Sequence, residues 1–402
     1  MTSRWEAYLD QTLESLRVTR LSRELRATVA GNHAAQAQTV GTGPGRTVRL
    51  FSLNDYLGLS THPQVCAAAA SAALAVGSGP RSSALVGGYT THHRELESDL
   101  ATLAGTEECL LFPSGFAANC SVMAAVAGSP EVEVFSDELN HASLVDGLRL
   151  AKAAGARVQV YRHNDMAHLE SLLQASPAKP TSRRLVVTDT LFSMDGDYAP
   201  LARLAELRRA HGFLLAVDEA HATLVCGDRG AGAAEAAGVE GSVDLHLGTL
   251  SKAVGCSGGF LACSRAWKAL LVAKARGQVF STAMPVPMAA AASAALRVAR
   301  EEPELRRRLW RHVGVLSGAL GLPSRSPILP VVVGAEARAL RLADDLWRAG
   351  FHVPAIRPPT VPAGTSRLRI SLSAAHSDAD VVALVGALQE QGLAGASAAA
   401  RL

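Results

Sequence analysis

Apolar and polar positions alternate regularly through the middle of the chain, from about residue 63 to 290. Short apolar runs have the length expected for buried strands, and polar turns and segments with helical periodicity separate them. The expected strands cover residues 108–112, 133–136, 157–161, 185–189, 213–218, 245–248 and 259–263. The expected helices include 118–127, 142–154, 167–174 and 199–211. Strands that alternate with helices predict an α/β fold, with a mostly parallel sheet covered on both faces.

The N-terminal segment has a different pattern. Residues 1–30 are predicted as an amphipathic helix, because apolar side chains recur near helical spacing and arginines fill the other face. A stretch rich in Gly, Thr and Gln follows at 31–46, and then a short strand at 47–52. We expect these parts to form an arm ahead of the main fold.

The C-terminal segment is predicted as a second, smaller α/β unit. A long helical stretch at 285–320 leads into it. Its expected elements are strands at 328–333, 351–356 and 367–372 and helices at 335–349 and 377–391. The expected organisation is therefore an N-terminal arm (1–62), a large domain (63–290) and a small C-terminal domain (291–402).

Composition narrows the class of protein. The 402 residues are 48% apolar, which allows a large core, and the net charge is only +3. The absence of a long basic run and the 4% content of aromatic residues argue against nucleic-acid binding. No apolar run is long enough to span a membrane, and the first residues lack a signal-peptide pattern. Six cysteines show neither zinc-site spacing nor a C-x-x-C pair, so we expect a cytoplasmic protein with reduced cysteines and no metal.

Lys252 stands out because lysine is rare in this chain. Only five of the 39 basic residues are lysines, and the others are arginines. Lys252 follows a strand-like run and comes shortly before Gly255, Gly258 and Gly259. Arginine cannot replace lysine where an amine must lose its proton or form an imine. The alternative is a solvated surface lysine, and Lys252 by itself does not exclude it.

The apolar run 213–217 leads directly into Asp218-Glu219-Ala220-His221. A carboxylate at such a strand end would be largely buried and would need a partner, for which a pyridinium nitrogen is one candidate. The letters D-E-A-H also occur in nucleotide-dependent helicases. Such enzymes need a G-x-x-x-x-G-K-[ST] loop, and no lysine here follows a glycine or precedes Ser or Thr. The helicase interpretation is therefore excluded.

Three other turns follow expected strands. In the stretch 110–119 a strand, a small-residue turn and a helix start follow one another, and backbone amides at a helix N-terminus bind phosphate well. His141 lies in a second turn and Ser193 in a third, where its hydroxyl could cap the turn or donate to a ligand. Each of these features has an ordinary structural explanation when it is taken alone.

The order of these features along one predicted sheet is more informative. Ligands of such sheets bind beyond the carboxyl ends of the strands, and all of these features fall there. Lys252 would form an imine, Asp218 would hold the ring nitrogen protonated, and Thr249 with backbone amides would hold a phosphate. These are the groups that pyridoxal phosphate needs. The sequence therefore predicts a pyridoxal-phosphate enzyme.

The chain resembles the α-oxoamine synthases, pyridoxal-phosphate enzymes of fold type I that condense an amino acid with an acyl thioester. The resemblance covers about residues 1–391. The motifs that carry it are N-D-Y-L-G-L at 54–59, S-G-F-A-A-N at 114–119, H-A-S at 141–143, F-S-M-D-G-D at 192–197, D-E-A-H at 218–221, T-L-S-K at 249–252 and F-S-T-A-M-P at 280–285. Seven motifs in this order form a specific pattern.

The resemblance implies a role for each matching residue. Gly115 and Phe116 would contact the cofactor through the phosphate turn. His141 would stack on its ring and assist the condensation, and Ser193 and His221 would hydrogen-bond it. The implied catalytic residues are Lys252, His141, Asp218 and His221.

The resemblance also implies a shared site. Thr249 would bind the phosphate, and Lys252 would carry the Schiff base. Ser281 and Thr282 would reach the phosphate of the neighbouring subunit, because the sites of this family form at a dimer interface. Arg369 would pair with the carboxylate of the amino acid. A homodimer is therefore expected.

The stretch 355–365 is similar to the members of the family that condense L-alanine with a pimeloyl thioester in biotin biosynthesis. The thioester would be pimeloyl-CoA or pimeloyl-acyl carrier protein, and the sequence leaves both open. A sister enzyme that uses glycine, of the 2-amino-3-ketobutyrate CoA ligase type, is an alternative. A catalytically silent homologue that serves as a binding protein is a further one, which the intact Lys252, Asp218, His141 and His221 disfavour.

The acyl substrate would lie along three residues. They are Arg23 of the N-terminal arm, together with Arg357 and Thr360 of the C-terminal segment. Arg20 and Arg26 lie close to Arg23 in the same expected helix, and either of them could take its role.

Overall fold

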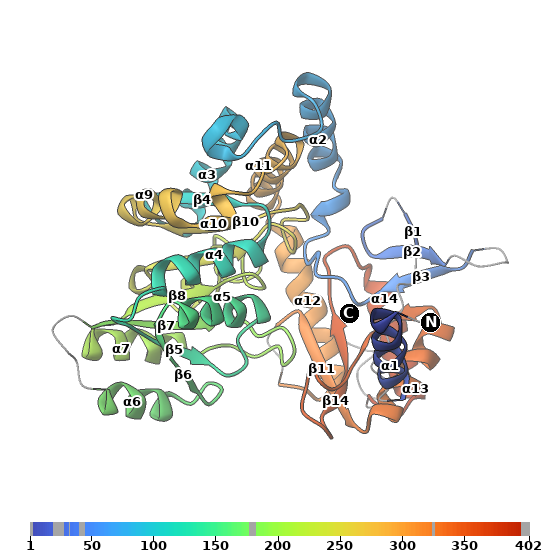
Figure 1. The fold of residues 1–402 in the computed structure, drawn as a ribbon. Helices are drawn as coiled ribbons and strands as arrows, with labels where there is room; N and C mark the ends of the chain where they lie inside the picture. Colours follow the sequence, from blue (N-terminus) through green and yellow to red (C-terminus); the bar gives the residue numbers. More distant parts are fainter. Residues whose placement is uncertain are drawn as a thin grey trace.

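The computed structural model describes residues 3–18, 28–31, 33–39, 45–176, 182–323 and 326–394. Its central strands are β4 (Glu108–Phe112), β5 (Val132–Asp137), β6 (Arg157–Tyr161), β7 (Arg183–Asp189), β8 (Leu214–Asp218), β9 (Leu245–Thr249) and β10 (Gly259–Cys263). They form one sheet in the order β4-β10-β9-β8-β7-β5-β6 (Figure 1). Only β10 pairs antiparallel, with β4 and with β9, and the other pairs are parallel. The predicted α/β fold with a mostly parallel sheet is confirmed.

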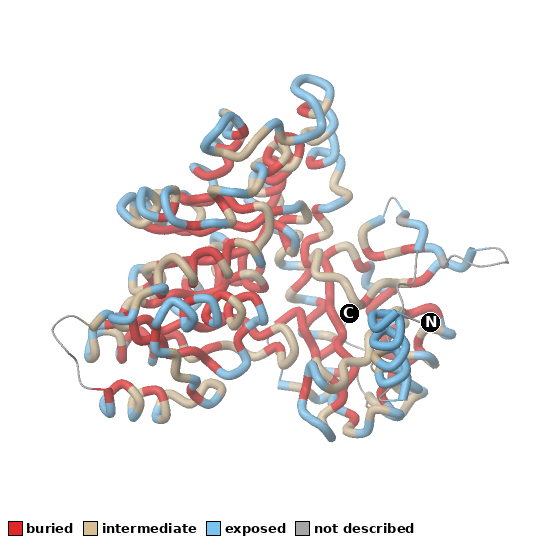
Figure 2. The backbone as a smooth tube through the Cα atoms, in the orientation of Figure 1, coloured by how far each residue is buried: buried red, intermediate tan, exposed pale blue. Residues whose placement is uncertain are grey.

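Helices cover both faces of this sheet. The helices of this part of the chain are α2 (Pro63–Val76), α3 (Thr91–Ala104), α4 (Gly115–Ala127), α5 (Ala142–Ala153), α6 (Met166–Ala175), α7 (Leu201–His211), α8 (Ala233–Ala236), α9 (Arg265–Lys274) and α10 (Arg276–Val279). In β7, Leu185 and Val187 belong to the buried cluster of α4 and α5, whereas Val186 belongs to that of α6 and α7. A strand buried on both faces is apolar at successive positions, which explains the continuous apolar runs. Figure 2 shows these strands buried and the outer helix surfaces exposed.

The C-terminal segment forms a three-stranded sheet with helices. Its elements are α11 (Val286–Glu301), α12 (Glu304–Leu320), β11 (Ile328–Gly334), α13 (Glu336–Arg348), β12 (Phe351–His352), β13 (Ala355–Ile356), β14 (Ser366–Ser371) and α14 (Asp378–Glu390). The sheet has the order β11-β14-β13. The prediction of one long helix at 285–320 was wrong, because Pro303 lacks an amide hydrogen and separates α11 from α12.

The predicted strand at 351–356 is two short strands in two different sheets. β13 pairs with β14, whereas β12 pairs in parallel with β3 (Thr47–Leu50). Pro354 stands between the two strands and cannot donate to a ladder. β12 thereby joins the C-terminal segment to the N-terminal strands in a sheet of order β1-β2-β3-β12, which includes β1 (Thr28–Ala30) and β2 (Gln36–Thr39).

The N-terminal helix is shorter than predicted. α1 covers Arg4–Val18, and none of its residues is buried. Residues 28–30 of the predicted helix instead form β1, and residues 36–39 of the predicted polar stretch form β2. The two segments are strands because their backbones pair with each other in an antiparallel ladder. Short turns of helix occur at η1 (Leu59–Thr61), η2 (Ala84–Gly88) and η3 (Glu240–Ser242). The proposed domain boundaries at 62 and 290 stay a prediction.

No helix in the described part of the chain is long and apolar enough to cross a membrane.

Candidate active site

A cavity of about 260 Å³ lies at the carboxyl ends of β7, β8 and β9. Asp189, Asp218 and Thr249 are the last residues of these three strands, and all of them line it. Eight residues predicted from the sequence line this one cavity: Gly115, Phe116, His141, Ser193, Asp218, His221, Thr249 and Lys252. The parallel strand pairing brings these residues together although they are spread over 138 positions of the chain.

One end of the cavity is built to bind an anion. The Ser114 side chain caps α4 by accepting the amide of Ala117 at 3.1 Å. The amides of Gly115 and Phe116, at the start of the same helix, have no acceptor within the helix. The hydroxyls of Thr249 and Ser251 lie 2.8 Å apart beside this helix end. Two free amides, two hydroxyls and the positive end of a helix form a phosphate-binding arrangement.

Gly115 is required at this position by close packing. A β-carbon there would meet Thr249 Cβ at 2.9 Å and Thr249 Oγ1 at 3.0 Å. The backbone of the turn can therefore approach the threonine hydroxyl only without a side chain. The same hydroxyl donates to the Gly258 carbonyl at 3.0 Å, which holds it at the end of β9.

The other end of the cavity is acidic and buried. Asp218 Oδ2 accepts the side-chain amide of Asn119 at 2.6 Å, and its Oδ1 accepts the amide of Ala220 at 2.8 Å. Asn119 also donates to the Ser143 hydroxyl at 2.9 Å, so its orientation is determined by two partners. Asp189 accepts the backbone amide of His141 at 3.0 Å. Burial and the charge of Asp218 raise the pKa of Asp189 well above its usual range.

Lys252 is half-buried in the cavity wall. Burial lowers the pKa of its amine, although Asp218 and Asp189 favour the charged form. The positive charge of Arg369 also lowers the pKa of Lys252, because it disfavours a second cation nearby. A lysine with a depressed pKa can serve as a nucleophile or a base near neutral pH, which a solvated surface lysine cannot.

Two histidines face the cavity, and each has a partner on one ring nitrogen. His221 is buried, and its Nδ1 lies 2.6 Å from the hydroxyl of Tyr56. His141 Nδ1 accepts the backbone amide of Ser143 at 3.2 Å and lies 2.6 Å from the Ser143 hydroxyl. Burial lowers the pKa of both histidines, and the Lys252 charge adds to this effect. Both are therefore neutral near pH 7.

Several residues at the site were not predicted from the sequence, among them Tyr56, Asn119, Ser143 and Asp189. Tyr56 and Asn119 stand in the N-D-Y-L-G-L and S-G-F-A-A-N motifs, and Ser143 in H-A-S, so the motifs contained a signal for three of them. Asp189 ends β7 as Asp218 ends β8, paired with it in register. Asp189 could have been identified from the sequence as a second acid at the end of an expected strand.

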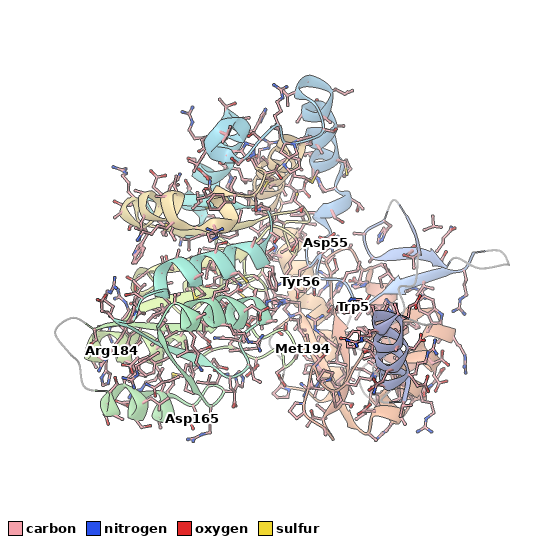
Figure 3. The ribbon with its side chains drawn as sticks, viewed as in Figure 1. Trp5, Asp55, Tyr56, Asp165, Arg184 and Met194 are labelled. Carbon is pink, nitrogen blue, oxygen red and sulfur yellow. The ribbon has the colours of Figure 1, made fainter. Side chains whose placement is uncertain are left out.

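Arg369 is buried next to the cavity and has partners already. Its Nε donates to the Ser193 carbonyl, and its Nη1 donates to the Ser371 hydroxyl at 2.9 Å. Asn54 Oδ1 lies 3.4 Å from both of its terminal nitrogens. Figure 3 shows Asp55 and Tyr56, which follow Asn54, in the middle of the molecule, where the large sheet meets the C-terminal part.

The remaining predicted residues do not line this cavity. Ser281 and Thr282 lie in the segment before α11, where Thr282 forms a bridge to Ser83. Arg357 is half-buried, 4.0 Å from Glu336, and Thr360 is exposed. Arg23 lies outside the described residues, as do its alternatives Arg20 and Arg26.

The donor set of the cavity fits pyridoxal phosphate. The helix start with Gly115 would hold a phosphate, because its amides lie beside the Thr249 hydroxyl with no side chain at position 115 between them. Asp218 is a buried carboxylate with a cavity-facing side suited to a protonated ring nitrogen. Lys252 supplies an amine with a depressed pKa for the aldehyde.

Known proteins share this sequence and fold. Residues 46–388 match the family of class I and II aminotransferases. The chain is 52% identical over 360 residues to the 8-amino-7-oxononanoate synthase of Arabidopsis thaliana, an alignment that covers 86% of this chain and 75% of that protein. It is 48% identical over 373 residues to the 8-amino-7-oxononanoate synthase of Anaeromyxobacter dehalogenans, with 91% and 92% covered.

Solved structures agree with the sequence relatives. A structure of SPT (serine palmitoyltransferase) with a PLP internal aldimine has a TM-score of 0.89 and 29% identity, and covers 97% of this chain and 98% of that one. The predicted pyridoxal-phosphate cofactor and fold type I architecture are confirmed. The chain belongs to the class I and II aminotransferase family of pyridoxal-phosphate enzymes and, within it, to the 8-amino-7-oxononanoate synthases.

Proposed function

We propose that this acyltransferase condenses L-alanine with a pimeloyl thioester, releases CO2 and the free thiol, and forms 8-amino-7-oxononanoate for biotin biosynthesis. The observation that carries the proposal is the convergence of Lys252, Asp218 and the N-terminus of α4 on one cavity. The 43–52% identity to curated synthases of this name supports the choice of alanine and of the pimeloyl group.

Pyridoxal phosphate, when bound, supplies an aldehyde that links to an amine and a ring that withdraws electrons from the adjoining carbon. Thr249 and the amides of Gly115 and Phe116 would hold its phosphate. Asp218 would keep a proton on the ring nitrogen, and the 2.6 Å bond from Asn119 orients the carboxylate for this purpose. His221 and Ser193 would donate to the ring substituents.

Lys252 would bind the aldehyde of the cofactor and, as a free amine, would act as a base. Burial lowers the pKa of the freed amine, so a larger share of it is neutral near pH 7. A neutral amine beside the α-carbon of alanine can remove the α-proton. The same amine, once protonated, can return a proton after CO2 has left.

Arg369 and His141 would hold the two substrates. Arg369 is buried and already oriented by the Ser193 carbonyl and the Ser371 hydroxyl, so its remaining donors suit the alanine carboxylate. His141 Nδ1 accepts the amide of Ser143, so its proton lies on Nε2. That proton would be donated to the carbonyl oxygen of the thioester, where negative charge develops.

The acyl chain would extend towards the C-terminal segment. Arg357 and Thr360 follow β13 and would line its path, with Arg23 or a neighbouring arginine of the arm closing over it. The carrier of the pimeloyl group would be coenzyme A or an acyl carrier protein. A cytoplasmic location is proposed as well, supported by six cysteines that are all free thiols.

A homodimer with shared sites is part of the proposal. Leu85 and Val86 of η2 and Phe280 are large apolar side chains with exposures of 55%, 81% and 69%. η2 packs against α10, and the Ser83–Thr282 bridge holds the segments of these side chains together. We call Leu85, Val86 and Phe280 the apolar patch. A partner on the apolar patch would bring Ser281 and Thr282 to the cavity of the other subunit.

The test is a reconstituted reaction. The protein is loaded with pyridoxal phosphate and mixed with L-alanine and either pimeloyl-CoA or pimeloyl-acyl carrier protein, and thiol release and product mass are measured. Parallel reactions use glycine with acetyl-CoA. Product with the mass of 8-amino-7-oxononanoate supports the proposal, and preferential turnover of glycine with acetyl-CoA contradicts it.

Lys252→Ala is expected to abolish turnover, by about a thousandfold or more, because both the link and the base are lost. It should also lose the visible absorbance of the linked cofactor. Lys274→Ala, at an exposed lysine at the end of α9, is the matched control and should behave as the unmodified enzyme. Turnover retained in Lys252→Ala would overturn the role of this lysine.

A further inference from the structure

His163 joins two parts of the chain through two carboxylates. It follows β6, and its Nδ1 lies 2.9 Å from Asp137 Oδ1 and its Nε2 lies 2.8 Å from Asp197 Oδ2. Asp137 ends β5, and Asp197 belongs to the loop after β7. An ionised carboxylate can only accept hydrogen bonds, so both ring nitrogens must donate. An imidazole that donates from both nitrogens is a cation.

The other groups that contact the two carboxylates are hydrogen-bond donors. Asp137 Oδ1 accepts the amide of Leu139, and its Oδ2 accepts the amide of Asn164, each at 2.9 Å. The Asn164 side chain gives its two protons to Asp197 Oδ2 and to the Tyr198 carbonyl, so its 3.1 Å contact with His163 Nε2 is proximity and not a third bond. Burial opposes the charge on His163, but the two carboxylates outweigh it and raise the pKa of His163 to about 10.

The other charged groups beside His163 do not compete for its two ring nitrogens. Glu138 accepts the backbone amide of His163 at 2.8 Å and adds to the negative potential. Arg162 and Asp165, on the same segment, pair with each other at 2.6 Å. Phe192 packs its ring edge-to-face with the imidazole at 4.4 Å between centroids. The two carboxylates are therefore the partners that determine the charge state of His163.

The loop that His163 anchors carries a residue of the active site. Residues 192–197 form a closed turn, in which the amide of Phe192 donates to the Asp197 carbonyl at 3.0 Å and that of Gly196 donates to the Phe192 carbonyl at 2.9 Å. Ser193 of this loop lines the cavity, and its carbonyl accepts Arg369 Nε. Figure 3 shows Met194 of the loop between the large sheet and the C-terminal sheet.

The loop is thus held from two sides. His163 holds Asp197 against the large sheet, and Arg367 of β14 donates to the Met194 carbonyl at 3.2 Å and to Asp195. We propose that the His163 cation is a positioning residue, which holds the loop 192–197 in place and through the Ser193 carbonyl aims Arg369 at the carboxylate of the amino-acid substrate. This inference rests on the proposed function in one respect, the assignment of Arg369 to that carboxylate.

The first experiment separates substrate binding from turnover. In His163→Gln the carboxylates lose the cation that joins them, and the loop can shift by a fraction of an ångström. Misplacement of this size has large effects on a bound substrate, so the KM for alanine should rise by roughly tenfold or more while kcat changes by less than about threefold. Asp197→Asn, which removes the other half of the pair, should have the same effect, and the double variant should add little to it.

His168→Gln is the matched control, because His168 lies on α6 and contacts Arg162 rather than the loop. It should leave both constants unchanged. An unchanged KM in both His163→Gln and Asp197→Asn would overturn the proposal. If His163→Gln does not fold, Asp197→Asn alone decides, because it replaces one carboxylate oxygen by an amide nitrogen and leaves the size of the side chain unchanged.

The second experiment needs no turnover and uses the protein loaded with pyridoxal phosphate. Nitrogen-15 NMR of labelled histidine should show an imidazolium at position 163 at pH 8, assigned by its loss in His163→Gln. Hydrogen exchange of the peptide 190–198 should be faster in His163→Gln than in His168→Gln. A neutral imidazole at pH 8 would contradict the proposal. If the unmodified enzyme fails to condense alanine with the thioester, the proposed function is wrong. The NMR spectrum and the hydrogen exchange then still test the role of His163.

Discussion

The polar side chains that face the cavity depend on neighbours that orient them. Asn119 fixes Asp218, Tyr56 pairs with His221, and the amide of Ser143 sets the tautomer of His141. Sequence patterns identified Asp218, His221 and His141, because these residues stand in ordered motifs at the ends of expected strands. They did not identify the partners, since a hydrogen bond between residues 165 positions apart leaves no spacing to recognise.

Tyr56→Phe is expected to weaken cofactor binding by about tenfold, because His221 Nδ1 would lose its buried partner. A buried polar group left unsatisfied costs about 1–3 kcal/mol, which should also lower the melting temperature. Cofactor titration by absorbance and thermal denaturation measure the two effects. Tyr161→Phe is the matched control, because the buried Tyr161 hydroxyl has no hydrogen-bond partner within the described residues. Equal behaviour of the two variants would refute the role of Tyr56.

At the scale of elements, the strand and helix predictions succeeded where burial dominates. β4, β6 and β10 have the predicted bounds, and the other central strands differ by one or two residues at one or both ends. The failures occur where the partner of a segment decides its structure. Residues 28–30 form a strand because β2 lies beside them, and residues 351–352 pair with residues of β3 that lie 302 positions earlier in the chain.

Gly115→Ala is expected to weaken cofactor binding by at least about tenfold, because the added methyl group would meet Thr249 at 2.9 Å. Overpacking of this kind costs about 1–3 kcal/mol and would move the hydroxyl of Thr249 away from the helix start. Gly314→Ala is the control, since a β-carbon there meets nothing within 4 Å and improves the propensity of α12. Cofactor titration should separate the two, and undiminished affinity in Gly115→Ala would contradict the phosphate-binding role of the turn.

At the scale of the whole molecule, the proposed dimer has a direct test. Phe280→Asp places a charge in the apolar patch and should raise the dissociation constant of the dimer by about tenfold or more. Analytical ultracentrifugation over a range of concentrations measures it. Val332→Asp, at a 59% exposed side chain of β11, is the control. A dimer weakened by Val332→Asp and not by Phe280→Asp would place the interface elsewhere.

The connection through His163 should make stability depend on pH in a defined direction. The pKa of His163 is raised to about 10 in the folded protein, against about 6.5 in an unfolded chain. Its contribution to stability is therefore fully present below about pH 6.5, declines above that, and is gone beyond about pH 10. Urea denaturation should give a difference between the unmodified protein and His163→Gln that is larger at pH 6 than at about pH 10.5. A difference that does not change with pH would argue against the cation.

By itself the sequence determined the fold class, the cofactor chemistry and eight of the residues around the cavity. Buried strands must be apolar, and the chemistry of an imine, a buried acid and a phosphate site restricts which residues can serve. Only the tertiary structure decided which side chains orient these residues and how the loop 192–197 is held between two sheets. Those contacts join residues far apart in the chain, and they form only when parallel strands bring their ends to one edge.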